Sequence, residues 1–222
     1  MLPDFAGYLE LWSAGHGGYD PRGNPLVHGW LRLTYAAARP FARRRVSPDA
    51  LTGLGLLVCA LVPLAVAPGG GWPLLAVPVI VASGLVDGVD GAVAVLTGRV
   101  SRFGSVLDGV ADRIGEALYV LALWLLGAPG WLCVLGAGLA ALQEYARARA
   151  GAAGMTEVGV VTVWERATRV VVTAFALGFA GLAGLLVPSW VGAVATVGAA
   201  AWVVLGAVGL VQVLVVARRL LG

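Results

Sequence analysis

Charged residues are scarce in this sequence. They make up 12% of its 222 residues, whereas an ordinary soluble domain has about a quarter. Hydrophobic residues make up 59%, and the mean hydropathy is +0.90. A soluble fold of this size could not bury so much apolar surface, so lipid must be part of its solvent. A single membrane domain is the simplest interpretation.

Lysine is absent, and all fifteen basic residues are arginines. Because the arginines stand beside apolar segments, membrane topology explains the net charge of +3 better than nucleic-acid binding does. Cys59 and Cys133 lie inside apolar runs, which predicts two small buried side chains and excludes a disulfide framework or a zinc-binding spacing. The sequence has no internal repeat, so an inverted-repeat transporter gains no support.

Six apolar segments follow one another, each long enough to cross a hydrocarbon core of ~30 Å. They are predicted at 48–67, 73–97, 104–126, 130–150, 163–186 and 190–216. Residues 28–45 alternate apolar and arginine positions, which predicts a basic amphipathic helix on the cytoplasmic surface. The glycine-rich residues 1–27 are interpreted as an N-terminal cytoplasmic segment of loop or surface character. The predicted fold class is all-α: a polytopic bundle of six transmembrane helices preceded by the amphipathic helix.

The distribution of arginine predicts the orientation. The connections after the first, third and fifth spans contain no arginine, whereas the second connection, the span ends that flank the fourth connection, and both termini do. By the positive-inside rule, both termini are cytoplasmic and the protein crosses the cell membrane several times. Small residues in the last two spans allow close helix packing. These residues are Gly178, Gly181, Gly184, Gly192, Gly198, Gly206 and Gly209. The predicted homodimer could use such faces, although glycines at this density also occur without oligomerisation.

Four aspartates interrupt the apolar spans. Asp87 and Asp90 are three residues apart in one predicted helix, and Asp108 and Asp112 are four apart in the next, so each pair shares a helix face. A carboxylate inside a membrane helix costs roughly 2.5–3.5 kcal/mol, and four ionised ones would repel one another. A divalent cation is the simple remedy. Carboxylate oxygens suit Mg²⁺ or Mn²⁺, and no histidine stands nearby to favour zinc.

Two such ions suit diphosphate chemistry, because they bridge phosphate oxygens and neutralise the leaving group. Glycines beside the aspartates let a phosphate or ribose approach the backbone. They are Gly88, Gly91 and Gly104. The sequence therefore predicts a two-metal site for a diphosphate substrate.

The stretch Asp87-Gly-Val-Asp90-Gly91-Ala-Val-Ala94, followed by Gly104-x-x-x-Asp108-x-x-x-Asp112, resembles the signature of the CDP-alcohol phosphatidyltransferases. That signature reads D-x-x-D-G-x-x-A-R and then G-x-x-x-D-x-x-x-D, and the sequence matches seven of its eight positions. The resemblance covers 28–216 and assigns 28–222 to a membrane domain of this family. It implies an enzyme of phospholipid biosynthesis that transfers a phosphatidyl group from CDP-diacylglycerol to an alcohol and releases CMP.

The resemblance also implies roles for the matching residues. The metal ligands would be Asp87, Asp90, Asp108 and Asp112, and Asp112 would also be the general base. The CDP group would contact Gly91, Ala94, Gly104 and Thr52. Thr52 stands in a P-x-x-x-T segment similar to that of the family, but Ser47 and Pro48 also fit an ordinary helix start, and both interpretations of Thr52 stay open.

The arginine of the signature is missing, because Val95 stands at its position. Arg99, one turn further on, is predicted to take its place against the CDP group, and Arg102 is the second candidate. The alternatives are weaker nucleotide binding, an altered donor, or a non-catalytic member of the family.

Arginines beyond the fourth span indicate the acceptor. Tyr145-Ala-Arg147-Ala-Arg149-Ala and Glu165-Arg166-Ala-Thr-Arg169 resemble segments of phosphatidylinositol-phosphate synthases, and guanidinium groups suit phosphate. An inositol phosphate is therefore the favoured acceptor, with four acceptor-binding residues: Arg147, Arg149, Arg166 and Arg169. The alternative for each arginine is a positive-side membrane anchor. The stretch 107–113 fits these synthases less well, so glycerol 3-phosphate and phosphatidylglycerol stay open as acceptors.

Two other protein classes compete. Membrane prenyltransferases also bind magnesium diphosphate through aspartates, but their acidic motifs are far apart, whereas both pairs here lie within 26 residues. A transporter would space its acidic groups along a path across the bilayer. Release of CMP from a CDP-lipid separates the predicted enzyme from both.

Overall fold

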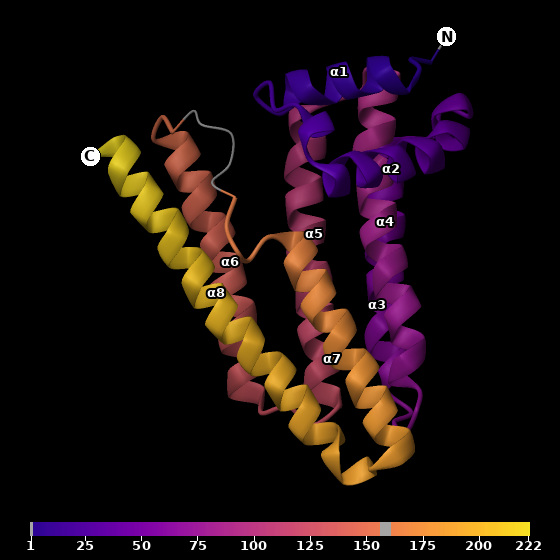
Figure 1. The fold of residues 1–222 in the computed structure, drawn as a ribbon, viewed down its shortest axis with the longest axis vertical. Coiled ribbons are helices and arrows are strands. Elements are labelled where there is room, and N and C mark those ends of the chain that lie inside the picture. Colours follow the sequence, from indigo (N-terminus) through magenta and orange to yellow (C-terminus); the bar gives the residue numbers. More distant parts are fainter. Residues whose placement is uncertain (1, 156–160) are drawn as a thin grey trace. The chain divides into compact units, whose positions relative to one another are not determined.

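The computed structural model describes residues 2–155 and 161–222, and this part of the chain is helical and has no β-strand. Figure 1 shows its eight α-helices: α1 (Phe5–Gly15), α2 (Pro25–Arg43), α3 (Pro48–Val66), α4 (Pro73–Thr97), α5 (Arg102–Leu125), α6 (Gly130–Ala152), α7 (Arg166–Leu186) and α8 (Val191–Leu221). Short 3-10 turns lie at Pro21–Gly23 and Pro188–Trp190. The all-α prediction is confirmed, and each predicted span coincides with one helix from α3 to α8.

Four helical segments are long and apolar enough to cross a membrane: Pro48–Val66, Pro73–Thr97, Arg166–Leu186 and Pro188–Leu221. The chain is therefore a membrane protein. Helices α5 and α6 have 24 and 23 residues, a spanning length, but each carries several charged side chains that lower its hydropathy. The prediction of six spans is thus supported by composition for four of them.

The described helices divide into two compact units, of which the first comprises Met1–Leu57 and Ser83–Asp112. In this unit α1 and α2 run across the ends of α4 and α5 (Figure 1). One face of α2 is buried, while its arginines are exposed. The core of the unit consists of Tyr8, Leu9, Leu31, Tyr35, Ala38, Ala42, Leu51, Val89, Ala92, Val93 and Leu96.

Of the two characters expected for residues 1–27, loop or surface segment, the loop is wrong for Phe5–Gly15, which form helix α1. Its first turn is capped by Asp4, whose side chain accepts a hydrogen bond from the Gly7 amide at 2.9 Å. A helix this short is marginal alone, so it depends on burying Tyr8 and Leu9 in the core of the unit. That packing cannot be read from the local sequence.

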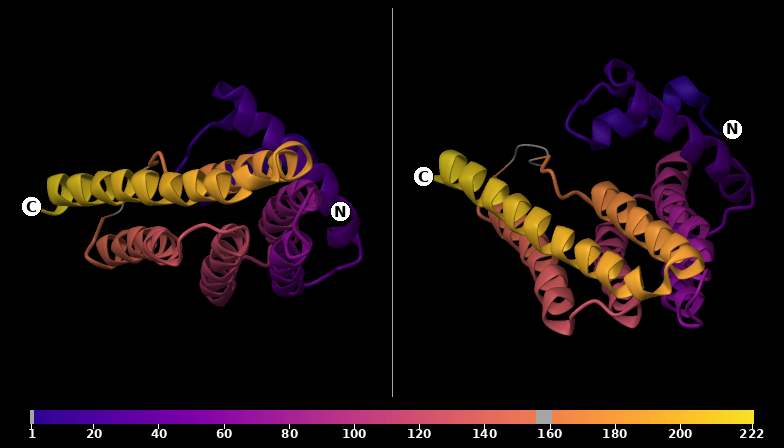
Figure 2. Two further views of the ribbon diagram at one scale, coloured as in Figure 1. Left: turned by 90° about the horizontal axis from the view of Figure 1, so that it is seen from below. Right: turned by 60° about the horizontal axis from the view of Figure 1, so that its bottom comes forward.

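The second unit comprises Val58–Ala82 and Arg113–Gly222, and α8 runs alongside α6 and α7 (Figures 1 and 2). Glycines make this close packing possible. A Cβ at Gly198 would lie 2.7 Å from the Cβ of Ala176, and one at Gly181 would lie 2.6 Å from the Leu74 amide. The glycines of α7 and α8 are thus used within the chain, and they do not support the predicted homodimer.

Candidate metal and nucleotide site

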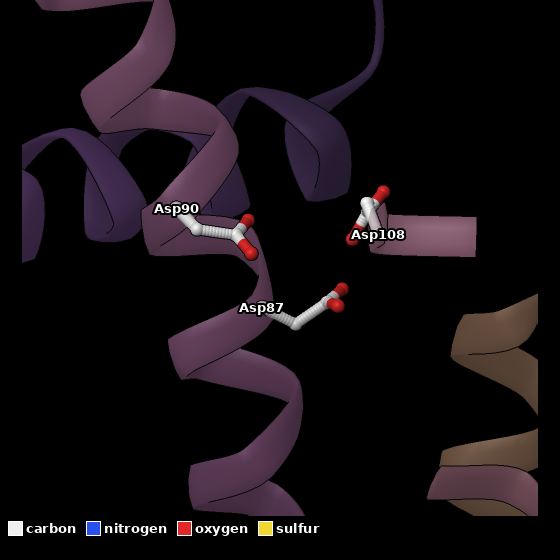
Figure 3. A group of neighbouring side chains, drawn as sticks. All are labelled: Asp87, Asp90 and Asp108. Atoms are coloured by element: carbon white, nitrogen blue, oxygen red, sulfur yellow. The ribbon is translucent and has the colours of Figure 1, made fainter. Parts of the chain in front are cut away.

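Three aspartates of the first unit converge. Asp87 and Asp90 lie one turn apart on α4, Asp108 lies on α5, and one oxygen from each lies within 4.8 Å of the others. Figure 3 shows the three carboxylates pointing toward one another. These oxygens suit a hard divalent cation. We call these three residues the aspartate cluster.

A tight connection between α4 and α5 brings the aspartates together. Gly98 has a φ of 64°, a left-handed conformation that favours glycine, and it ends α4. The Arg99 amide then donates to the Ala94 carbonyl at 2.9 Å. The side chain of Ser101 accepts from the Gly104 amide at 2.9 Å and caps the start of α5. The turn chemistry of 98–104 therefore sets the position of Asp108 against α4.

Asp90 is buried, with 6% of its surface exposed. The Thr52 hydroxyl donates to its Oδ2 at 2.5 Å, and the Gly91 amide lies 2.5 Å from its Oδ1. A hydrogen bond to a charged group is among the stronger ones in proteins, so Thr52 orients this carboxylate. The sequence left Thr52 open between nucleotide contact and helix start, and neither interpretation included this role.

A cavity of about 390 Å³ lies beside the cluster, within the range of small-ligand sites. Its lining includes Asp90 and Asp108. It also includes all five residues predicted to contact the CDP group: Thr52, Gly91, Ala94, Arg99 and Gly104. These residues, which come from separate segments of the sequence, thus line the same cavity.

The three glycines beside the aspartates differ in what surrounds them. A Cβ at Gly88 would lie 2.8 Å from Thr34 Cγ2 and 3.1 Å from the Trp30 ring, so Gly88 is needed for packing against α2. A Cβ at Gly91 would meet no atom within 4 Å. Only Gly91 therefore combines open space with the cavity wall, as close approach of a ligand requires.

Val95, at the position of the missing signature arginine, lines the cavity, and so does Arg99. Arg99 Nη1 donates to the Arg45 carbonyl at 3.3 Å. A guanidinium group therefore reaches this cavity from one turn beyond the signature position. The cavity also has lining residues that the sequence analysis missed: Tyr8, Trp12, His16, Trp30 and Asp49.

Asp112 lies one turn beyond Asp108 on α5 and is half-buried. It is not one of the three residues whose oxygens converge within 4.8 Å. Its roles as fourth ligand and as base stay predictions.

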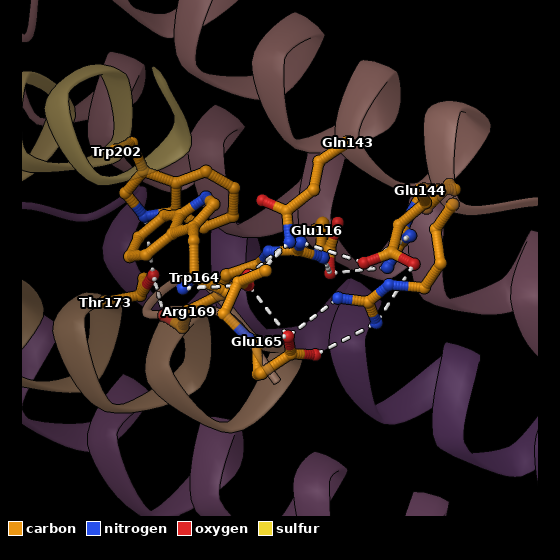
Figure 4. Close-up of polar contacts among 11 residues, drawn as sticks. Glu116, Gln143, Glu144, Trp164, Glu165, Arg169, Thr173 and Trp202 are labelled. Carbon is orange, nitrogen blue, oxygen red and sulfur yellow. Dashed lines mark hydrogen bonds and ion pairs between the residues drawn. The ribbon is translucent and has the colours of Figure 1, made fainter. Parts of the chain in front are cut away.

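In the second unit, arginines and glutamates form a network (Figure 4). Arg169 is fully buried, and its Nη1 and Nη2 donate to Glu116 at 2.7 Å and to Glu144 at 3.0 Å. Arg113 Nη2 also donates to Glu116 at 2.7 Å. The Arg169 guanidinium thus holds two carboxylates, and its predicted contact with the acceptor stays a prediction.

Arg147 makes the second part of the network, through two hydrogen bonds to Glu165 at 3.1 and 2.7 Å. Glu165 also accepts from the Thr162 amide at 2.7 Å. Burial by itself would raise the pKa of Glu165, but the hydrogen bonds from Arg147 and Thr162 outweigh it and hold that pKa below its ordinary value. The other two predicted acceptor residues differ in exposure: Arg149 is exposed, and Arg166 is half-buried at the start of α7.

The sequence profile of the CDP-alcohol phosphatidyltransferase family matches residues 45–212. The chain belongs to this family. It is an enzyme of phospholipid biosynthesis that uses a CDP-linked lipid donor, an alcohol acceptor and a divalent metal ion.

Relatives of this CDP-alcohol phosphatidyltransferase include the phosphatidylinositol phosphate synthase of Cutibacterium acnes, which is 30% identical over 86% of this chain and 95% of that protein. The phosphatidylinositol phosphate synthase of Mycobacterium tuberculosis has a similar structure. With CDP-DAG bound, that structure has a TM-score of 0.68 and 26% identity and covers 84% of this chain and 94% of that one. In complex with manganese and citrate, it has a TM-score of 0.67 and 26% identity, covering 83% and 88%.

Proposed function

We propose that this enzyme transfers the phosphatidyl group of CDP-diacylglycerol to an inositol phosphate and releases CMP. The observation that carries the proposal is the single cavity in which Asp90 and Asp108 meet Gly91, Ala94 and Arg99. An open glycine beside convergent carboxylates fits a metal-bound diphosphate. The acceptor is supported by the arginine-rich segments and by the name of the relatives from Cutibacterium acnes and Mycobacterium tuberculosis.

The aspartate cluster, joined by Asp112, would hold Mg²⁺ or Mn²⁺, with two ions as our expectation. When bound, such ions supply charge neutralisation of the diphosphate and polarisation of its phosphorus. Thr52 contributes by fixing the orientation of Asp90. Gly91 and Ala94 form the wall against which the nucleotide lies, and Arg99 provides the positive charge that Val95 does not.

Asp112 acts as the general base. Its carboxylate takes the proton of the acceptor hydroxyl while that oxygen forms a bond to the β-phosphorus of the donor. The bond from this phosphorus to the bridging oxygen breaks, and CMP leaves with the electron pair.

The acceptor phosphate is bound by the arginines of α6 and α7. Arg149 and Arg166 contact it, while Arg147 and Arg169 are held in place by their glutamates and add positive charge. The ion pairs of this network therefore fix two of the four proposed acceptor arginines, Arg147 and Arg169.

The proposed orientation in the membrane is based on the distribution of the arginines. The helices α3 to α8 form six spans in the cell membrane, and α2 lies on its cytoplasmic surface with both termini and the active site. We also propose that the protein forms a homodimer, and that its interface lies on a surface other than the glycine faces of α7 and α8.

The test is CMP release by the purified full-length protein in detergent. Each reaction mixture contains CDP-diacylglycerol, Mg²⁺ or Mn²⁺, and one acceptor: inositol phosphate, glycerol 3-phosphate or phosphatidylglycerol. We expect CMP only with inositol phosphate, and none from the Asp112→Asn variant. Release of CMP with one of the other acceptors instead would show that the proposed acceptor is wrong. Absence of CMP release by folded protein that binds metal would refute the proposed reaction.

A further inference from the structure

Helix α1 lies outside the family segment, which begins at residue 45, and yet its side chains reach the cavity beside the aspartate cluster. Tyr8, Trp12 and His16 all line this cavity. They are spaced four residues apart, so they share one face of the helix and of the turn that ends it. This chain therefore adds a wall to the cavity from a segment that the family match does not include.

Helix α1 is held in place by aromatic contacts with α2. Tyr8 is 1% exposed, and its ring lies 5.4 Å from that of Tyr35 on α2. The Tyr35 hydroxyl donates to the Pro3 carbonyl at 3.1 Å, which ties the start of α1 to α2. The Phe5 ring also packs on Tyr35, at 5.3 Å. Such aromatic pairs hold an element in one position, as a binding surface requires.

Trp12 and His16 form a stacked aromatic pair, in which one ring lies on the face of the other. Their ring centroids are 3.8 Å apart and their planes differ by 15°, a stacked arrangement. His16 Nδ1 donates to the Trp12 carbonyl at 2.7 Å and fixes the imidazole against the indole. Trp12 is half-buried.

The lining of the cavity is thus of two chemical kinds. The segment from α3 to α5 contributes carboxylates, glycines and Arg99, whereas the segment from α1 to α2 contributes mainly aromatic and apolar side chains, among them Trp12, His16 and Trp30. A CDP-linked lipid has the same two kinds of group in its head: a charged diphosphate and a planar base. A volume of about 390 Å³ accommodates such a head group.

We propose that the stacked Trp12–His16 pair is the platform for the donor, with the cytosine ring lying on an outer face of the pair. The inference rests on the proposed function, since it requires a CDP-linked donor in this cavity. Stacking of a base on an aromatic side chain contributes about 1–3 kcal/mol, which corresponds to roughly 5- to 150-fold in affinity.

The experiment compares the full-length protein with Trp12→Ala, Trp12→Phe and His16→Ala. Leu11→Ala is the matched control, because Leu11 is on the same helix, is 49% exposed and does not line the cavity. Binding of CDP is measured by titration calorimetry with Mg²⁺, and donor KM and kcat are measured from CMP release. For Trp12→Ala we expect about tenfold weaker CDP binding, a similar rise in donor KM and an unchanged kcat. Trp12→Phe and Leu11→Ala should stay near the unmodified protein, and His16→Ala should lie between.

Equal CDP affinity in the unmodified protein and in Trp12→Ala would overturn the platform while leaving the proposed function intact. Weaker binding of CDP-diacylglycerol with unchanged binding of CDP would also overturn it, because the aromatic wall would then contact the acyl chains. An unmodified protein that neither binds CDP nor releases CMP would refute the proposed function and the platform together. If Trp12→Ala does not fold, the His16→Ala variant provides the test, because His16 is exposed. An unchanged CDP affinity in His16→Ala would then overturn the proposal.

Discussion

The two units of this enzyme each place acidic side chains among apolar helices, but they balance the charge differently. In the first unit, three aspartate oxygens lie within 4.8 Å of one another. In the second, every glutamate of the network has an arginine partner: Glu116 at 2.7 Å, Glu144 at 3.0 Å and Glu165 at 2.7 Å. The aspartate cluster concentrates charge of one sign, whereas the network combines three glutamates with three arginines.

A buried charge is tolerated when a partner compensates for its lost hydration. The glutamate network meets this condition with groups of the chain itself, so its first role is to hold α5, α6 and α7 side chains in place. The aspartate cluster gathers like charges, which the proposed divalent cation would neutralise. Acidic residues therefore serve stability in one unit and, in the proposed function, metal binding in the other.

The largest effect is expected for Asp90→Asn. Removing one carboxylate should reduce CMP release by about a hundredfold or more, since one electrostatic group is lost from the reacting centre. Without metal, the melting temperature should stay the same or rise, because repulsion within the cluster falls. Glu10→Gln, an exposed acid on α1, is the control. A large drop in melting temperature in EDTA would show that the cluster is structural, like the network.

Arg169→Met should act on stability first. It removes the Arg169 guanidinium from the buried Glu116 and the half-buried Glu144. We expect a destabilisation of about 3 kcal/mol, at the lower end for a broken buried pair, because Arg113 still contacts Glu116 at 2.7 Å. Denaturant unfolding in detergent measures this, with the exposed Arg218→Met as control. The double variant Glu116→Gln/Arg169→Met should recover part of the loss. Unchanged stability in Arg169→Met would show that the network does not stabilise the fold. The difference drawn between the two units would then be wrong.

Thr52→Val should weaken the metal site without removing it. The variant keeps the side-chain shape but loses the hydroxyl that donates to Asp90 at 2.5 Å. A hydrogen bond to a charged group is worth about 1.5–3 kcal/mol, so the Mg²⁺ concentration for half-maximal CMP release should rise about tenfold or more. Thr52→Ser retains the hydroxyl and should behave as the unmodified protein. An identical metal dependence in Thr52→Val would mean that Asp90 needs no orientation.

The smallest effect concerns pH and Glu165. Its pKa in the folded protein lies below the ordinary value of 4.5, so its stabilising contribution is present above that pH and is lost as the pH falls through the folded value. Glu165→Gln should therefore melt at a lower temperature than the unmodified protein at pH 7, and the difference should shrink below about pH 4.5. Arg147→Met should show the same deficit at pH 7. A difference that stays constant with pH would contradict the assignment of the ion pair.

Much of the fold could be predicted from the sequence, because long apolar runs and their glycine and proline boundaries are local signals. The helix at Pro73–Thr97 has the bounds predicted for its span. Helix α1 could not be predicted in this way, since its stability comes from Tyr8 and Leu9 buried among residues of other helices. The spacing of Tyr8, Trp12 and His16 was visible as a pattern, but nothing local indicated what it faces.

The sequence by itself determined the membrane class, the family and the two aspartate pairs, because composition, periodicity and spacing are properties of neighbouring residues. Only the tertiary structure decided which glycine packs against a helix and which opens to the cavity, and that Arg169 pairs with Glu116, 53 residues away. It also brought the aromatic face of α1 to the cavity. Such contacts join residues far apart in the chain, and they depend on how helices pack rather than on what any helix is made of.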